Sequence, residues 1–227
     1  HELDLSKLSY KANDTYSTHI ETRSNRPTLI LGKSGRFFSL HTHELPSAKS
    51  VGEPITTKLT LAPDDSPHTL LPYDNEANLL ITTREGNGFQ VPMHTLDTRA
   101  RKGKDVVKVT ENDSMLTPII LKGQTKLVLL TKAGRLAIID IDEVNISNKS
   151  QGTRLINIKD EEFLSGEDEL CDVLPINDDD KFSIHVGKKK VSYPPEKWLN
   201  FVSKRARRGL YMEQRPVTNL PLKLSIS

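Results

Sequence analysis

The chain has 227 residues, of which 35% are hydrophobic and 27% are charged. This length predicts one large domain or two ordinary ones, and the short dense apolar runs exclude a chain that is disordered throughout. No stretch approaches the roughly 20 apolar residues of a membrane span. A single cysteine, Cys171, excludes a disulfide framework and a zinc site built on several thiolates, and it favours a cytoplasmic protein. The opening His1-Glu2-Leu3, without Met, indicates a fragment of a longer protein.

The net charge of +2 conceals alternating blocks of charge. Residues 51–98 carry a net −5 and residues 99–154 a net +5. Residues 155–180 then carry −9, and residues 181–227 carry +9. Because the local field attracts a polyanion more than the total charge does, the two basic blocks indicate an anionic partner.

A four-part repeat organises the chain after residue 27. Residues 1–27 are interpreted as the tail of an incomplete earlier unit, with its last strand at residues 16–22. Four apolar runs then each lead into a turn centred on glycine, and a second apolar run follows each turn. Such glycines supply the positive φ of a tight turn, so each unit is predicted to open with a β-hairpin. The hairpin glycines are Gly35, Gly86, Gly134 and Gly187.

Each unit continues with the same landmarks in the same order. A second glycine follows at Gly52, Gly103, Gly152 and Gly209. A strand is predicted after each of them, at residues 55–61, 106–109, 155–158 and 210–212, and a last strand closes each unit at residues 69–71, 118–121, 170–174 and 220–224. Helix is expected only as single turns near residues 194–202.

Four short strands in a period near 50 residues predict an all-β propeller of four-stranded blades. We expect one domain over residues 1–227, with units at approximately 1–27 (partial), 28–78, 79–126, 127–181 and 182–227. A β-sandwich remains an alternative, because it also spaces short strands regularly. A helical solenoid is disfavoured, because no unit sustains a 3.6-residue period.

Basic residues gather in two kinds of loop, the hairpin turns and the loops that carry the second glycine. In a propeller, equivalent loops lie at equivalent places on the circumference, so these residues would form a positive band that replaces the counterions of duplex DNA. The loop at residues 47–52 is nearly neutral, and aromatic residues are only 5% of the chain, which argues against base stacking on single strands. The predicted DNA-binding residues are Lys33, Arg36, Arg84, Arg99, Arg101, Lys102, Lys104, Lys132, Arg135, Lys149, Arg154, Lys188, Lys189, Lys190, Lys204, Arg205, Arg207 and Arg208.

Several motifs, taken together and in order, resemble one protein family. They are the segment at residues 52–63, Gly86-Asn87-Gly88-Phe89, Arg101-Lys102-Gly103-Lys104 and the segment at residues 184–190. They resemble the C-terminal domain of ParC, the DNA-cleaving subunit of bacterial DNA topoisomerase IV. The related domain of DNA gyrase A, which wraps DNA, is the alternative. It carries an intact basic glycine-rich box, whereas residues 99–105 and 148–154 here look like degenerate copies, which favours topoisomerase IV.

The resemblance implies a β-pinwheel whose blades exchange strands, five-bladed in many members, that binds and bends duplex DNA along its edge. It places this chain in an ATP-dependent type II topoisomerase that relaxes supercoils and decatenates chromosomes at the bacterial nucleoid. It implies no catalytic residue and no cofactor in this domain, since ATP binds to the partner subunit, while Mg lies in the catalytic core. The implied partners are duplex DNA, the N-terminal breakage-reunion region of the same polypeptide, and the ATP-binding second subunit of topoisomerase IV in a heterotetramer.

Other sites are weaker predictions. His41 and His43 would share one face of a strand, but the sequence offers no convincing further metal ligands. Asp178-Asp179-Asp180 resembles a site for a hard cation, although a solvated turn explains it better. Cys171 is expected to be a small core residue. A protein-interaction propeller, whose basic loops meet an acidic partner, remains the second functional alternative.

Overall fold

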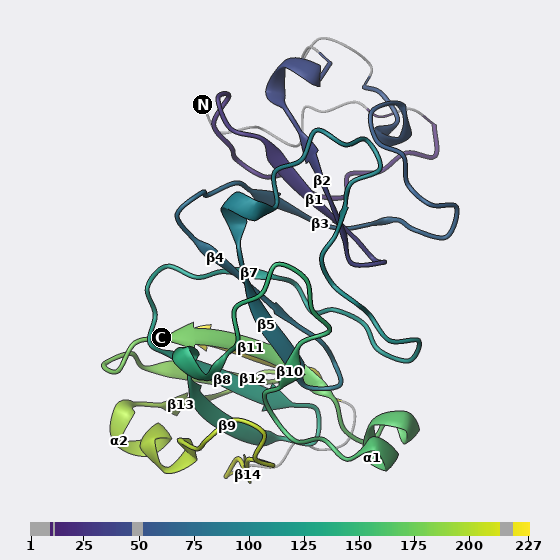
Figure 1. The fold of residues 1–227 in the computed structure, drawn as a ribbon. Coiled ribbons are helices and arrows are strands. Elements are labelled where there is room, and N and C mark those ends of the chain that lie inside the picture. The colour runs from purple at the N-terminus through teal and green to yellow at the C-terminus, as the bar shows by residue number, and fades with distance from the viewer. Residues whose placement is uncertain (1–9, 11, 47–51, 214–219) are drawn as a thin grey trace.

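The computed structural model describes residues 10, 12–46, 52–213 and 220–227. Four antiparallel sheets follow one another along the chain, from the first at the N-terminal end to the fourth at the opposite end of the molecule (Figure 1). The predicted all-β architecture is confirmed, and each predicted hairpin forms.

The strands assemble as follows. The first sheet has the order β3-β1-β2-β6, made of β3 (Pro67–Pro72), β1 (Thr28–Gly32), β2 (Arg36–Leu40) and β6 (Lys104–Asp105). The second has the order β10-β5-β4-β7, made of β10 (Thr153–Arg154), β5 (Asn87–Pro92), β4 (Asn78–Thr82) and β7 (Ile119–Ile120). The third has the order β11-β8-β9-β14, made of β11 (Leu170–Ile176), β8 (Lys126–Thr131), β9 (Arg135–Asp140) and β14 (Leu210–Tyr211). The fourth has the order β13-β12-β15, made of β13 (Lys189–Tyr193), β12 (Phe182–Val186) and β15 (Leu222–Ile226).

The first three sheets are each completed by a strand from the following repeat. Strand β6 pairs with β2, β10 with β5, and β14 with β9. The strand exchange that the resemblance implied is therefore present. We call β6, β10 and β14 the exchange strands, and the basic loops at residues 99–103, 148–152 and 204–209 that lead into them the exchange loops.

Helical structure is short and confined to connections. The α-helices are α1 (Asp160–Ser165) and α2 (Pro195–Trp198), and the 3-10 turns are η2 (Thr42–Glu44), η3 (Ile55–Thr57), η4 (Met93–Thr95), η5 (Ile141–Glu143) and η6 (Leu199–Phe201). The helical turns predicted near residues 194–202 are α2 and η6. Helix α1 was not predicted.

Continuous apolar strands fill the spaces between the sheets. Leu29, Ile30 and Leu31 are all fully buried, which requires cover on both faces of the first sheet. One apolar cluster joins the first and second sheets, a second joins the second and third, and a third joins the third and fourth. Each sheet thus packs on its neighbours, as blades of a propeller do.

The two ends of this stack are closed in different ways. The outer face of the first sheet, with Ile30 and Phe38, is covered by Ile55, Leu59 and Leu61. The outer face of the fourth sheet is polar instead: Ser183 lies in register with Ser192 and Ser225, and His185 with Lys190 and Lys223. Terminal repeats of this kind cap a repeat array against solvent.

Three strand predictions are wrong in detail. Residues 16–22 form no strand and are largely exposed. Residues 55–61 begin with η3 rather than a strand, because Pro54 offers no N–H to a sheet edge and the apolar residues instead cover the first sheet. The exchange strands lie about two residues earlier than predicted in the second and third units, because the apolar residues at 106–107 and 155–156 turn inward to the core.

Candidate nucleic-acid interface

Each hairpin turn and the following exchange loop form one composite structure at the sheet edge. The carbonyl oxygen of Gly35 accepts hydrogen bonds from the N–H groups of Val106 and Val107, at 3.2 and 2.9 Å. The Gly86 carbonyl oxygen accepts equivalent bonds from residues 155 and 156, and the Gly134 carbonyl oxygen accepts one from Met212. The two kinds of predicted basic loop therefore meet at each of the first three sheets.

Glycine is required at these junctions for space as well as for conformation. Gly35 has φ +86°, and a Cβ there would lie 2.1 Å from the carbonyl oxygen of Val107. Gly103, in the exchange loop, has φ +67°, and its Cβ would lie 2.5 Å from the carbonyl oxygen of Phe37. Both values are far below an ordinary contact distance, so the exchange strand can approach the hairpin only where both residues lack side chains.

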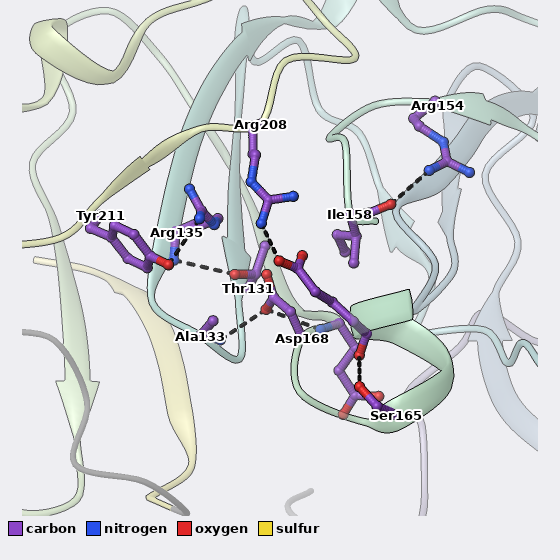
Figure 2. A network of polar contacts seen from close by, with 11 residues as sticks. Thr131, Ala133, Arg135, Arg154, Ile158, Ser165, Asp168, Arg208 and Tyr211 are labelled. Atoms are coloured by element: carbon purple, nitrogen blue, oxygen red, sulfur yellow. Dashed lines mark hydrogen bonds and ion pairs between the residues drawn. The ribbon is translucent and has the colours of Figure 1, made fainter. Parts of the chain in front are cut away.

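One cross-strand position holds each exchange strand with a different chemistry. Arg36 forms an ion pair of 2.5 Å with Asp105 across β2 and β6. In the third sheet the Arg135 guanidinium lies 4.1 Å from the centre of the Tyr211 ring and donates a hydrogen bond of 2.8 Å to its hydroxyl (Figure 2).

In the second sheet the cation lies on the exchange strand itself. Arg154 of β10 is 3.2 Å from the carboxylate of Glu85 and 4.0 Å from that of Asp160. It also donates a hydrogen bond to the carbonyl oxygen of Ile158 (Figure 2). Arg36, Arg135 and Arg154, all predicted to bind DNA, are therefore placed to fasten exchange strands.

Eight further predicted residues are also engaged within the domain. Arg101 donates hydrogen bonds to the carbonyl oxygens of Thr57 and Lys58, at 2.6 and 3.0 Å. The half-buried Lys104 donates one to the carbonyl oxygen of Thr95. The other engaged side chains are Arg84 with Glu169, Lys132 with the Gly166 carbonyl oxygen, Lys149 with Asp105, Lys204 with Glu143, Arg205 with the Arg154 carbonyl oxygen, and Arg208 with Glu162.

Seven predicted residues form a different class. Their side chains are exposed and, within the part of the chain that the structure describes, make no hydrogen bond or ion pair. We call them the free cations, and they are Lys33, Arg99, Lys102, Lys188, Lys189, Lys190 and Arg207. They belong to the edges of the first, third and fourth sheets. At the second sheet, Arg84, Lys149 and Arg154 are all engaged, so the predicted positive band is uneven.

The sequence interpretation missed the acids that neutralise the basic loops. The acidic residues of α1 and its flanks lie among them: Glu162 binds Arg208, and Figure 2 shows Arg208 reaching this helix. The hydrogen bond from Arg208 lowers the pKa of Glu162, and the same bond raises the pKa of Arg208. The charge block at residues 155–180 was the available signal, but only the fold shows which cations it meets.

A second missed feature is an aspartate that clamps each of the first three hairpins. Asp65, Asp113 and Asp168 accept hydrogen bonds from the turn N–H groups of Ser34, Glu85 and Ala133, at 3.0, 3.0 and 2.9 Å. All three precede the third strand of their own sheet. Their recurrence at matching places in the repeat was a signal that could have been read from the sequence.

The weaker predicted sites have ordinary structural explanations. The rings of His41 and His43 stack with centroids 5.7 Å apart, and the described residues contain no group of three or more metal-binding side chains. Asp180 accepts a hydrogen bond from the N–H of Asn177, as expected of a turn. Cys171 donates to the carbonyl oxygen of Leu130, and burial raises its pKa to about 12. No helix among the described residues is long and apolar enough to cross a membrane.

Comparisons with known proteins place this architecture in a family. A family model described as the DNA gyrase C-terminal domain, beta-propeller, matches residues 77–122 and 125–166. The ParC subunit of DNA topoisomerase 4 from Salmonella typhimurium is 32% identical over 213 residues, or 93% of this chain. The chain spans only 28% of that relative's length.

Solved structures agree with this assignment. The structure of the E. coli ParC C-terminal domain matches with a TM-score of 0.89 and 30% identity, covering 100% of this chain and 91% of that one. The DNA gyrase A C-terminal domain matches with a TM-score of 0.53 and 14% identity, over 96% of this chain and 88% of that one, which shows the shared fold alone. The chain therefore belongs to the β-propeller family of DNA gyrase A and topoisomerase IV ParC C-terminal domains.

Proposed function

We propose that this chain is the non-catalytic domain of a topoisomerase IV ParC protein, and that it binds and bends duplex DNA and positions it for strand passage. The observation that carries the proposal is the set of seven exposed free cations at the sheet edges. Such side chains can contact phosphates without first breaking an internal ion pair. With few exposed aromatic rings and no recognition helix among the described residues, contact with the duplex backbone is favoured over reading of base sequence.

The parent protein would supply the chemistry. We propose that it is an ATP-dependent type II topoisomerase that acts on the bacterial nucleoid, with ATP on its partner subunit, while Mg lies in the catalytic core. This domain would then work beside the breakage-reunion region of its own polypeptide, within a heterotetramer that includes the ATP-binding partner. Holding one duplex in place can lower a reaction barrier by several kcal/mol without contributing any chemical group.

DNA binding is tested with two variants that each lose four positive charges. The first replaces the free cations Arg99, Lys102, Lys188 and Lys190 with Gln. The matched control replaces the exposed but engaged Arg84, Lys132, Lys149 and Lys204 with Gln. Affinity for random-sequence duplex DNA is measured by fluorescence anisotropy between about 50 and 200 mM salt, and circular dichroism checks that both variants fold.

We expect the wild type to bind with a slope of log K against log salt of about −4 to −6, as for five to seven phosphates neutralised. The free-cation variant should lose about 10- to 100-fold in affinity, and its slope should become shallower by about 0.9 for each lost contact. The control should lose much less. Equal losses in both variants would reduce the effect to net charge, and a slope near zero would favour the protein-interaction alternative.

Positioning is tested on the parent enzyme with and without this domain. Relaxation of positive supercoils, relaxation of negative supercoils and decatenation are measured in parallel. We expect cleavage activity to persist in the truncated enzyme and the three rates to fall. Full activity on every substrate would refute the accessory role.

A further inference from the structure

Helix α1 presents an apolar surface that the DNA-binding proposal does not use. Leu164 is 67% exposed, although large hydrophobic side chains on short helices usually turn inward. It borders a hollow of about 390 Å³ together with Glu85, Thr110, Glu111, Asn112, Asp160 and Phe163. We call this hollow the α1 pocket.

The two sides of α1 have different roles. Asp160, Phe163 and Leu164 are spaced three and four residues apart, so they share one side of the helix, and all three line the α1 pocket. Glu162 faces elsewhere and binds Arg208 of an exchange loop. Phe163 also packs against the core between the second and third sheets. The helix is thus fixed on one side while it offers the other side to solvent.

The rim of the α1 pocket carries acids that nothing neutralises fully. All three charged residues that line it are acidic, and only Glu85 has a close cation, Arg154 at 3.2 Å. Asp160 is 82% exposed, with Arg154 no nearer than 4.0 Å. Glu111 is exposed and makes no ion pair or hydrogen bond within the described residues. Such a rim repels phosphate and attracts positively charged groups.

We propose that the α1 pocket is a docking site for a basic, apolar-anchored segment of a partner protein. A Leu, Ile or Phe side chain of that segment enters the hollow beside Phe163 and Leu164. Flanking Lys or Arg side chains pair with Glu111 and Asp160. A buried apolar anchor surrounded by complementary charge is the usual composition of a small protein-recognition site.

The proposal is tested on the full chain with a displayed library of random peptides of about 12 residues, a length that fills a recognition groove. Selection on the wild type is followed by subtraction on a Leu164→Ser variant, and recovered peptides are synthesised and measured by anisotropy. Asp160→Lys tests the acidic rim. Glu196→Lys and Leu199→Ser, two exposed residues at α2, are the matched controls.

We expect recovered peptides to combine an apolar residue with flanking Lys or Arg. Leu164→Ser and Asp160→Lys should each weaken their binding about tenfold or more, while Glu196→Lys and Leu199→Ser leave it unchanged. The affinity of Leu164→Ser for duplex DNA should equal that of the wild type, which also shows that the variant is folded. Failure to recover peptides specific for the wild type, or recovery of acidic peptides, would overturn the proposal. A DNA affinity that falls with Leu164→Ser would instead make DNA the occupant.

Discussion

Arginines on this chain have two distinct roles that look identical in the sequence. Arg36 and Arg99 both lie in or beside basic loops, yet Arg36 is bound to Asp105 whereas Arg99 is exposed without a partner among the described residues. What separates them is an acid delivered by the next repeat. The basic loops could therefore be predicted from the sequence, but the division between engaged and free cations could not, because it depends on contacts across about 70 residues of chain.

The hairpin glycines should be among the residues least tolerant of substitution. We predict that Gly35→Ala lowers the free energy of unfolding by about 3 kcal/mol or more, because the new Cβ meets the Val107 carbonyl oxygen in addition to the cost of a positive φ. Gly123→Ala is the control, since Gly123 has φ +82° and no atom within 4 Å of a Cβ there. It should cost only about 1 kcal/mol. Urea denaturation measures both, and equal losses would show that the close approach is not the cause.

The thiol of Cys171 should be almost inert in the folded protein. Its pKa, raised to about 12 by burial, leaves about a thousandfold less thiolate at about pH 8 than an ordinary cysteine has. Labelling by a thiol reagent in native buffer should therefore be slower by about that factor than labelling in concentrated urea. Because the chain has one cysteine, the signal needs no assignment. A native rate within tenfold of the denatured rate would mean that the β11 region opens readily.

At the scale of elements, the exchange strands show where reading of sequence pattern fails. β6, β10 and β14 are two residues long and lack an apolar run, so nothing in their own sequence indicates a strand. They form because a hairpin edge, a glycine junction and a cross-strand cation meet there. The long apolar strands β1, β4 and β8 were predictable because burial on both faces demands continuous apolar residues. Helix α1, with only six residues, was too short to show a helical period.

The contact between α1 and the last exchange loop predicts a pH dependence. Because Arg208 lowers the pKa of Glu162, the folded state prefers the charged carboxylate, and the stabilisation is present at neutral pH. It is lost as the pH falls through the lowered pKa. The half-buried pair should contribute about 0.5–1 kcal/mol.

We therefore expect Glu162→Gln to be less stable than wild type at pH 7, with the difference vanishing in acid. Burial raises the pKa of Asp172, whose effect has the opposite sign: its contribution is lost as the pH rises. That effect is common to both proteins, so it cancels in the difference. Urea unfolding at several pH values measures it, and a difference that does not change with pH would show that the ion pair contributes nothing.

At the scale of the whole molecule, the order of the repeats was predictable while the ends of the array were not. The repeat spacing indicated four hairpins, and three apolar layers join the resulting sheets. Nothing in the repeat pattern showed that residues 55–61 would cover the first sheet or that the outer face of the fourth would be polar. These ends leave the first and fourth sheets at opposite sides of the molecule (Figure 1). The free cations consequently fall into separated groups rather than a uniform band.

This separation predicts that the effect of each group depends on the length of the DNA. A duplex of about 8 base pairs, roughly 27 Å long, can occupy one end of the array at a time, whereas a duplex of about 40 base pairs can follow the whole edge. On the long duplex, replacing Lys188, Lys189 and Lys190 with Gln and replacing Arg99 and Lys102 with Gln should each weaken binding, and the two losses should add as free energies. On a short hairpin duplex either variant alone should lose only about twofold, because the DNA can still bind the other end. The combined variant should lose much more on both. If one variant alone abolishes binding of the short duplex, the other group lies off the DNA path, and the domain holds DNA at one end instead of bending it along its edge.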